Sequence, residues 1–280
     1  MQVRTSDGVT LALHYLGGSG PPLLMAHATG FHGRVFGPLA RHLSASFSCY
    51  ALDERGHGDS GRPEDGTFEW DEFGLDVVAC AERLAPDGTL FGLGHSCGGA
   101  ALLLAELARP NTFRALYCYE PIVLPPGFAP EGGDNPLSAA ARRRRYRFAS
   151  RREALQNYAS KPPFDALDPA VLEAYVEHGL RELPEGGVAL KCRPEDEATI
   201  YAMGARHQAY SLLGRVGCPV TVAFGERTDS IGADLVAQLV GRLPHGRAEQ
   251  LPGLGHFGPL EDPAAVAVSA ASALLSYPGR

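Results

Sequence analysis

The chain of 280 residues has no excess of basic residues and no apolar run as long as a membrane span. Its formal net charge is −7, which argues against a nucleic-acid-binding protein because such a protein usually carries a basic face. The opening stretch, MQVRTSDGVTLALHY, contains no apolar core of a signal peptide. We therefore expect a cytoplasmic protein that binds neither nucleic acid nor a membrane.

Cysteine is sparse, and its spacing excludes two common kinds of structural support. The six cysteines are scattered without a Cys-x-x-Cys pair, so neither a zinc site nor a disulfide framework is indicated. A chain of this length can bury a large core without either support. One large α/β domain, or such a domain with an insertion, fits the length.

Short apolar segments alternate with helical patterns through most of the chain. This alternation favours a mostly parallel sheet covered by helices on both faces. In such sheets, functional sites form beyond the carboxyl ends of the strands. The pattern predicts strands at 9–15, 22–27, 48–53, 89–93, 114–119, 220–224 and 248–251, and helices at 73–84, 99–108, 233–242 and 264–275.

Ser96 lies in the segment GHSCGG, directly between a predicted strand and a predicted helix. A sharp turn there would hold the serine in a strained conformation, and Gly94 and Gly98 would let the strand and the helix pass closely. The amino end of the following helix would direct its N–H groups toward the point of attack. A Gly-x-Ser-x-Gly match is weak by itself in a chain with 34 glycines, and its strand–turn–helix context strengthens it. We expect Ser96 to be a nucleophile.

A serine nucleophile needs a base, and the base needs an orienting acid. His256 follows the last predicted strand in the Gly-rich segment GLGHFGPLEDP, and Asp229 follows the strand before it. The resulting order of Ser96, Asp229 and His256 along the chain is the order expected for one fold class that uses this triad.

Four segments in this order resemble the α/β-hydrolase superfamily: LLMAHATGFHG, ALDERGHGDSG, GHSCGG and GLGHFGPLEDP. The resemblance implies an α/β-hydrolase fold with an eight-stranded, mostly parallel sheet. It assigns residues 1–120 and 218–280 to the core and residues 121–217 to a helical lid. One branch of the superfamily, the haloalkane dehalogenases, carries its acid after an earlier strand, where this chain has Glu120. Glu120 is therefore the alternative acid or a pocket carboxylate, and Asp229 is preferred.

The same resemblance implies an oxyanion hole made by two backbone N–H groups. One belongs to Cys97, the residue after the nucleophile. The other belongs to Thr29, with Gly30 as the alternative, in the segment HATG, where the family usually has His-Gly. Candidate pocket residues follow in that loop and on the expected lid helices: Phe31, His32, Met203, His207 and Tyr210.

The expected lid contains three helical patterns, at 135–159, 168–180 and 195–213. The first carries Arg142–Arg145, which invites the hypothesis of an anionic substrate. Consecutive arginines point in all directions around a helix, so a solvated helix face is the preferred interpretation.

These features predict a serine hydrolase that cleaves a small-molecule carboxylic ester or lactone through an acyl-enzyme, without a metal or organic cofactor. Thioester hydrolysis, C–C bond hydrolysis and acyl transfer are alternatives on the same triad. A ligand sensor that retains the triad is the alternative from another functional class.

Overall fold

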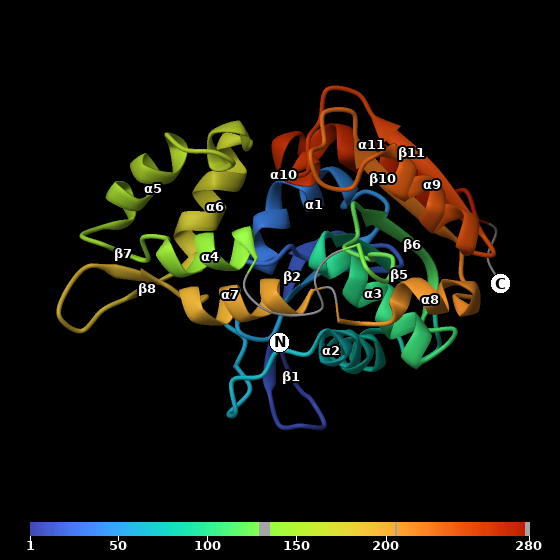
Figure 1. Ribbon diagram of the computed structural model, residues 1–280, viewed down its shortest axis with the longest axis horizontal. Coiled ribbons are helices and arrows are strands. Elements are labelled where there is room, and N and C mark those ends of the chain that lie inside the picture. The colour runs from blue at the N-terminus through green and yellow to red at the C-terminus, as the bar shows by residue number, and fades with distance from the viewer. Residues whose placement is uncertain (129–134, 205, 278–280) are drawn as a thin grey trace.

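The computed structural model describes residues 1–128, 135–204 and 206–277. Its main sheet has eight strands in the order β1-β2-β4-β3-β5-β6-β10-β11, as Figure 1 shows in ribbon form. The pairs β1–β2 and β2–β4 are antiparallel and the other neighbours are parallel. The strands are β1 (Gln2–Arg4), β2 (Thr10–Gly17), β3 (Pro22–Ala26), β4 (Ser48–Asp53), β5 (Leu90–His95), β6 (Phe113–Tyr119), β10 (Val220–Gly225) and β11 (Gly246–Leu251). The predicted eight-stranded, mostly parallel sheet is confirmed.

Alternate residues of each central strand enter two separate cores. In β3, Leu24 and Ala26 pack into the core beneath α2, α3 and α9, whereas Leu23 and Met25 pack into the core beneath α1 and α11. Side chains of a strand point to opposite faces in turn, so a fully apolar strand is covered on both sides. The five helices are α1 (Gly37–Leu43), α2 (Trp70–Leu84), α3 (Cys97–Ala108), α9 (Ala233–Arg242) and α11 (Pro263–Leu275), with the short α10 (Gly258–Glu261) before the last of them.

Between β6 and β10 the chain forms a group of short elements, most of them at the left and lower centre of Figure 1 and the last helix at the lower right. Its helices are α4 (Pro136–Arg143), α5 (Arg151–Ala159), α6 (Pro169–Gly179), α7 (Pro194–Met203) and α8 (Ala209–Leu212), and 3-10 turns lie at Phe164–Ala166 and Leu213–Arg215; another such turn, Gly33–Phe36, precedes α1 in the core. A small antiparallel sheet in the order β7-β9-β8 was not anticipated; its strands are β7 (Arg147–Phe148), β8 (Leu180–Glu182) and β9 (Val188–Leu190).

The single helix expected over 135–159 is wrong, because two helices and a strand occupy this stretch. Arg144 leaves the helical conformation at φ −66° and ψ 141°, and α5 begins anew at Ser150, whose side chain accepts a hydrogen bond from the N–H of Glu153. Between them the buried Phe148 pairs with Val188 of β9. Burial of Phe148 and a fresh helix cap therefore override the continuous helical pattern.

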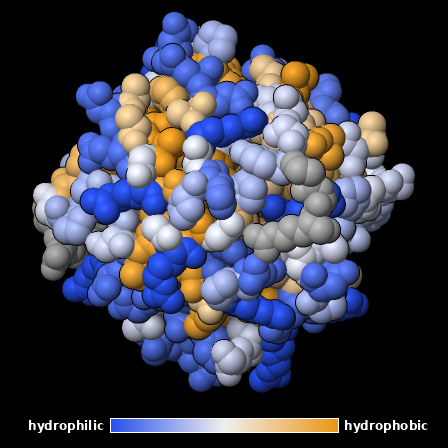
Figure 2. Space-filling model, turned by 90° about the vertical axis from the view of Figure 1, so that its right-hand side faces the viewer, coloured by the Kyte–Doolittle hydropathy of each residue, from blue (hydrophilic) through white to orange (hydrophobic). Residues whose placement is uncertain are grey.

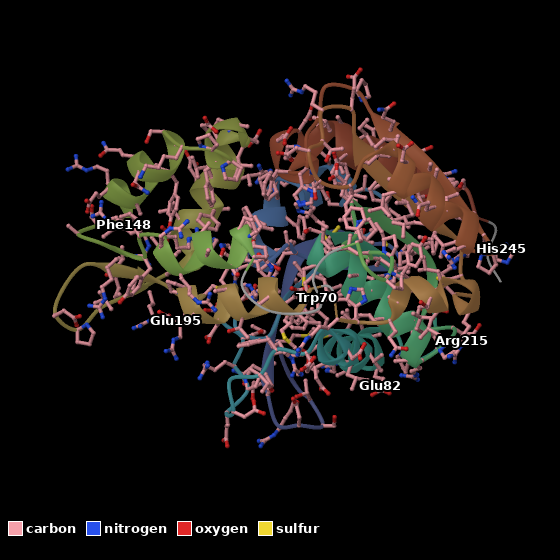
Figure 3. The ribbon with its side chains drawn as sticks, viewed as in Figure 1. Trp70, Glu82, Phe148, Glu195, Arg215 and His245 are labelled. Atoms are coloured by element: carbon pink, nitrogen blue, oxygen red, sulfur yellow. The ribbon has the colours of Figure 1, made fainter. Side chains whose placement is uncertain are left out.

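Polar contacts attach this segment to the core. Trp70, labelled in Figure 3, donates from its indole N–H to the carbonyl of Ile200 in α7 at 3.0 Å and stacks on His207. Arg62 forms two hydrogen bonds, of 2.9 and 3.1 Å, with the buried Asp196 at the start of α7. The segment is thus held against the core from both ends of α7.

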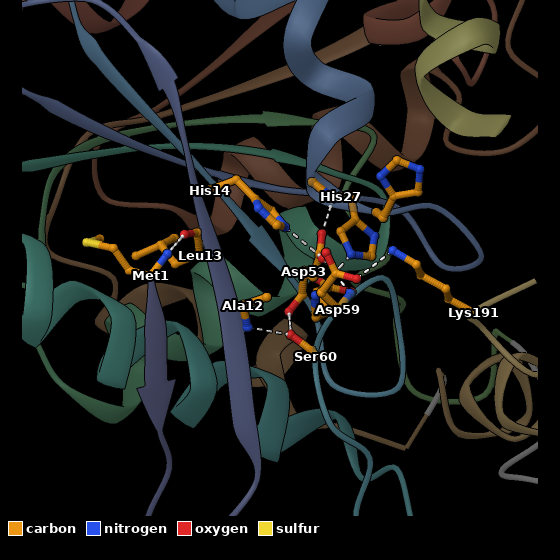
Figure 4. Close-up of polar contacts among 12 residues, drawn as sticks. Met1, Ala12, Leu13, His14, His27, Asp53, Asp59, Ser60 and Lys191 are labelled. Carbon is orange, nitrogen blue, oxygen red and sulfur yellow. Dashed lines mark hydrogen bonds and ion pairs between the residues drawn. The ribbon is translucent and has the colours of Figure 1, made fainter. Parts of the chain in front are cut away.

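The turn after β4 is organised by one buried carboxylate, Asp53 (Figure 4). It accepts hydrogen bonds from His14 at 2.8 Å and from the backbone N–H groups of Gly33 and Asp59 at 2.7 Å each. Burial acts to raise the pKa of Asp53, but the hydrogen bond and the charge of His14 leave it below its ordinary value. Lys191, from the segment after β6, pairs with the Asp59 carboxylate at the same turn.

On the face shown in Figure 2, apolar side chains are interspersed with hydrophilic ones. Among the described residues, no helix combines the length and the apolar character needed to cross a bilayer.

Candidate active site

Ser96 occupies a strained turn at the junction of β5 and α3. Its φ is 56° and its ψ is −115°, a combination that residues with side chains rarely adopt. A Cβ atom on Gly94 would lie 2.6 Å from the carbonyl oxygen of Gly98, and one on Gly98 would lie 2.2 Å from that of Ala26. Both flanking positions therefore require glycine, and the tight turn presents Ser96 at the carboxyl end of the sheet.

His256 links Ser96 to a carboxylate through both of its ring nitrogens. Its Nε2 lies 3.3 Å from Ser96 Oγ, and its Nδ1 lies 2.7 Å from Glu120 Oε2. A carboxylate only accepts hydrogen bonds, so Nδ1 carries the proton and Nε2 is free to accept one from the serine. The serine–imidazole distance is slightly long, as is common before a substrate is bound.

Glu120 is completely buried at the end of β6 and has a positive φ of 44°. Oε1 accepts from the N–H of Gly225 at 3.0 Å, and Oε2 accepts from the hydroxyl of Thr228 at 2.7 Å and the N–H of Ile231 at 3.4 Å. Together with His256, four donors converge on this carboxylate. Such donors fix the position of the carboxylate.

The contact expected between Asp229 and His256 is wrong. Asp229 is exposed in the loop after β10, and the partner of His256 is Glu120 from the neighbouring strand β6. The loop after β10 still contributes, because Thr228 and the N–H of Ile231 orient Glu120. The physical reason is that β6 and β10 are adjacent parallel strands, so their ends offer two carboxylates to one imidazole and only one can reach it.

The loop that carries His256 is fastened to the strands below it. His95 donates from Nε2 to the carbonyl of His256 at 2.9 Å, and the hydroxyl of Tyr119 donates to the carbonyl of Gly255 at 2.8 Å. A Cβ on Gly258 would lie only 2.1 Å from the Tyr119 hydroxyl. These bonds fix the height of the imidazole above Ser96.

Two buried histidines hold the backbone around Thr29. His27 donates from Nδ1 to the carbonyl of Ala28 at 2.8 Å and accepts at Nε2 from the N–H of Glu54 at 3.0 Å. His57 accepts at Nε2 from the N–H of Gly30 at 3.0 Å, and its Nδ1–H donates to a backbone carbonyl. Within the described residues, the N–H groups of Thr29 and Cys97 have no acceptor. They remain available for an oxyanion.

Neither of two candidate metal clusters fits a metal ion. His27, Glu54 and His57 lie close together, yet both imidazoles use both ring nitrogens in hydrogen bonds. Burial raises the pKa of Glu54 well above its usual range, which disfavours the charged form that a metal would need. In the second cluster, His14, Asp53 and Asp59 are already satisfied by one another, by backbone donors and by Lys191.

The five predicted pocket residues lie in three different places. Phe31 contacts Phe257, the neighbour of His256, at a ring distance of 5.7 Å. His32 is buried and donates to the carbonyl of Tyr175. His207 bonds to the carbonyl of Ile122, whose own N–H donates to the carbonyl of Ser96. Met203 packs against the core under α3, and Tyr210 packs on Gln238 and Arg242 of α9.

Sequence reasoning missed the aromatic residues around Phe31, and it raised Arg144 only as one of four arginines for which a solvated helix face was preferred. Phe257 could have been suspected because it follows His256. No local pattern singles out Phe164, Tyr158 or Tyr175 on the segment after β6.

The buried histidines make the folded protein sensitive to acid. Burial lowers the pKa of His27 to about 3 and that of His32 to about 4, and it also lowers the pKa values of His57 and His95. The unfolded chain, with values near 6.5, therefore binds more protons below pH 6.5, so stability is complete above that pH and decreases as the pH falls. From pH 6.5 to 5, His27 and His32 alone should cost about 3 kcal/mol of unfolding free energy, measured by urea titration.

The matched variants are His32→Gln, which should remove about half of that loss, and the exposed His42→Gln, which should leave it unchanged. An equal pH dependence in His32→Gln and the parent protein would contradict the assignment.

Comparison with known proteins agrees with this architecture. A family model described as the alpha/beta hydrolase family matches residues 23–269. A 2-(acetamidomethylene)succinate hydrolase of Mesorhizobium japonicum is 26% identical over 254 residues, which cover 86% of this chain and 83% of that protein. A pimeloyl-(acyl-carrier protein) methyl ester esterase of Xanthomonas campestris pv. campestris is 29% identical over 244 residues, which cover 85% and 89%. The crystal structure of an E-2-(acetamidomethylene)succinate hydrolase matches with a TM-score of 0.80 and 23% identity, covering 99% of both chains. The chain therefore belongs to the α/β-hydrolase family.

Proposed function

We propose that this protein is a serine hydrolase that cleaves a carboxylic ester or lactone of a small molecule through an acyl-enzyme. The observation that carries the proposal is the line of hydrogen bonds from Ser96 through His256 to Glu120. The named relatives are a hydrolase of a substituted succinate and a methyl ester esterase, which supports hydrolysis at an acyl carbon.

The proposed mechanism follows from the positions of the donors and acceptors. Ser96 Oγ attacks the carbonyl carbon while its proton passes to His256 Nε2. Glu120 holds the imidazole in the Nδ1–H tautomer and stabilises its charged form. The N–H groups of Thr29 and Cys97 stabilise the oxyanion. His256 then protonates the leaving alcohol, and a water molecule that it activates hydrolyses the acyl-enzyme.

We further propose that residues 121–217 act as a lid. Ser96 is only 7% exposed. Tyr201 of α7 donates to the carbonyl of Thr29 at 3.4 Å, and Tyr175 of α6 packs on Phe31 at a ring distance of 5.3 Å. These contacts with the loop expected to bind the oxyanion support the proposal, because a segment at this point would exclude water and select the substrate.

A serine-directed phosphonate tests the proposed nucleophile. We expect one adduct, located by mass spectrometry at Ser96 and absent from Ser96→Ala. Cys97 is the adjacent competitor, but burial raises the pKa of its thiol well above the usual range, so it is a poor nucleophile. Cys97→Ala keeps the backbone N–H and should be labelled as the parent protein is. An adduct at Cys97, or none in the folded parent protein, would refute the proposal.

A further inference from the structure

Arg144 differs from the other arginines of the cluster Arg142–Arg145 because it is turned inward. Its side chain is 17% exposed, whereas that of Arg145 is 50% exposed and Arg143 is exposed. The cause is the end of α4 at Arg143, after which the extended conformation of Arg144 directs its side chain away from the solvated face. A solvated face is therefore the wrong description for this residue.

The guanidinium of Arg144 lies among aromatic side chains and is held by two hydrogen bonds. Nη1 donates to Glu197 Oε2 at 2.6 Å, and Nη2 donates to the hydroxyl of Tyr175 at 2.9 Å. The rings of Tyr158 and Phe164 each lie 5.9 Å from the guanidinium carbon. Two of its five N–H groups are used in these bonds, so the others can serve a ligand.

This cluster adjoins the loop proposed to bind the oxyanion. A Cβ built on Gly30, the residue after Thr29, would lie 2.6 Å from Glu197 Oε1 and 3.4 Å from Arg144 Nη1. The loop at this point therefore runs directly beside the Arg144–Glu197 pair.

Aromatic rings connect the same cluster to the catalytic imidazole. Phe257 lies 5.1 Å from the His256 ring, Phe31 lies 5.7 Å from Phe257, and Phe164 lies 5.7 Å from Phe31. Phe164 in turn faces the guanidinium of Arg144. A continuous aromatic wall thus runs from the reacting groups to one buried cation.

The hydroxyl of Tyr158 gives an independent sign of a ligand. It is buried and, within the described residues, has no hydrogen-bond partner, although only 5% of Tyr158 is exposed. A buried hydroxyl without a partner lowers the free energy of unfolding by about 1–3 kcal/mol. If the hydroxyl had no role in binding, phenylalanine at this position would make the protein more stable. The free guanidinium N–H groups can only donate, and the Tyr158 hydroxyl can donate as well as accept, so an acceptor would satisfy both.

We propose that Arg144, Tyr158 and Tyr175 form a carboxylate-binding subsite, and that the substrate carries a carboxylate in addition to its scissile acyl group. A planar guanidinium beside two phenol hydroxyls matches the lone pairs of a carboxylate. Glu197 keeps the guanidinium paired when the subsite is empty, which lowers the cost of burying it. The statement about the substrate rests on the proposed hydrolase function, whereas the subsite itself does not.

Binding to the Ser96→Ala protein, measured by isothermal titration calorimetry, separates the subsite from the chemistry. The probes are succinate and its uncharged analogue succinamide. We expect succinate to bind and succinamide to bind at least about 10-fold more weakly. In the Ser96→Ala background, Arg144→Gln should weaken the binding of succinate about 100-fold. Arg143→Gln in the same background is the matched control and should change the affinity less than about 2-fold.

Tyr158→Phe distinguishes a ligand-binding role from a structural one. Because the Tyr158 hydroxyl has no partner in the fold, removing it should leave Tm unchanged or raise it. The same change should weaken the binding of succinate about 10-fold. A lower Tm with unchanged succinate binding, or equal binding of succinate and succinamide, would overturn the subsite. If Arg144→Gln does not fold, as judged by circular dichroism, Arg144→Lys takes its place. It should also weaken the binding of succinate, because lysine keeps the positive charge but lacks the planar guanidinium.

The substrate statement is tested with the active enzyme on monomethyl and dimethyl succinate. We expect a higher kcat/KM for the monomethyl ester, and a ratio between the two esters that falls at least about 10-fold in Tyr158→Phe. An unchanged ratio would overturn the substrate statement. Failure of phosphonate labelling at Ser96 together with normal succinate binding would refute the hydrolase function and leave the subsite standing.

Discussion

Replacing Ser96 with alanine should lower kcat for a chromogenic ester by about 10⁶-fold, the size of loss seen when a triad nucleophile is removed. The oxyanion donors and the binding pocket remain in this variant, so a small residual rate above that in water should persist. The measurement is the steady-state rate with p-nitrophenyl acetate, and circular dichroism serves as the check on folding.

Cys97→Ala is the matched control for this loss. It changes the neighbouring side chain in the same strained turn but leaves the backbone donor in place, so kcat should fall less than about 10-fold. Parent-level turnover in a Ser96→Ala protein free of contaminating esterase would exclude Ser96 as the nucleophile.

Replacing Glu120 with glutamine should lower kcat by about 10⁴-fold, whereas Asp229→Asn should change it less than about 2-fold. The amide of glutamine can donate to His256 Nδ1, which stabilises the wrong tautomer and takes the base away from Ser96. The exposed Asp229 does not touch the imidazole, so the loss of its charge should have little effect.

Glu120→Gln also places an NH₂ group among the donors of Gly225, Thr228 and Ile231, so the rate must be normalised to folded protein. Glu120→Asp retains the charge on a side chain one methylene shorter and should lose less activity than Glu120→Gln. A large loss of kcat in Asp229→Asn together with a small loss in Glu120→Gln would reverse the assignment of the acid.

The placement of Ser96 and His256 at the carboxyl edge of the sheet could be predicted from the sequence because local chemistry surrounds them. Gly94 and Gly98 indicate that the backbone is crowded at Ser96, and the glycines around His256 indicate a tight loop after a strand. The acid could not be decided in this way. Glu120 and Asp229 both follow strands that end at the same edge of the sheet, and the choice depends on which side chain turns toward His256.

The mostly parallel sheet of the core was likewise predictable, whereas the segment after β6 was not. Apolar runs such as that of β3 carry a strong signal because both faces are buried. The break between α4 and α5 depends on Phe148 pairing with Val188, a contact between residues 40 positions apart in the sequence. The inward turn of Arg144 depends on that break, so four consecutive arginines gave no sign of which one is buried.

The edge position of β11 has a consequence for how long the enzyme survives. Ser96 and Glu120 follow the interior strands β5 and β6, but His256 follows β11, which pairs only with β10 and ends the sheet. Edge strands and the loops after them open locally at lower free energy than the interior of a domain. Fraying of β11 that also broke the bonds from His95 and Tyr119 to the loop would withdraw the imidazole while the rest of the molecule stays folded. Inactivation would then precede melting, and the working lifetime of the enzyme would be set by one strand rather than by the whole fold.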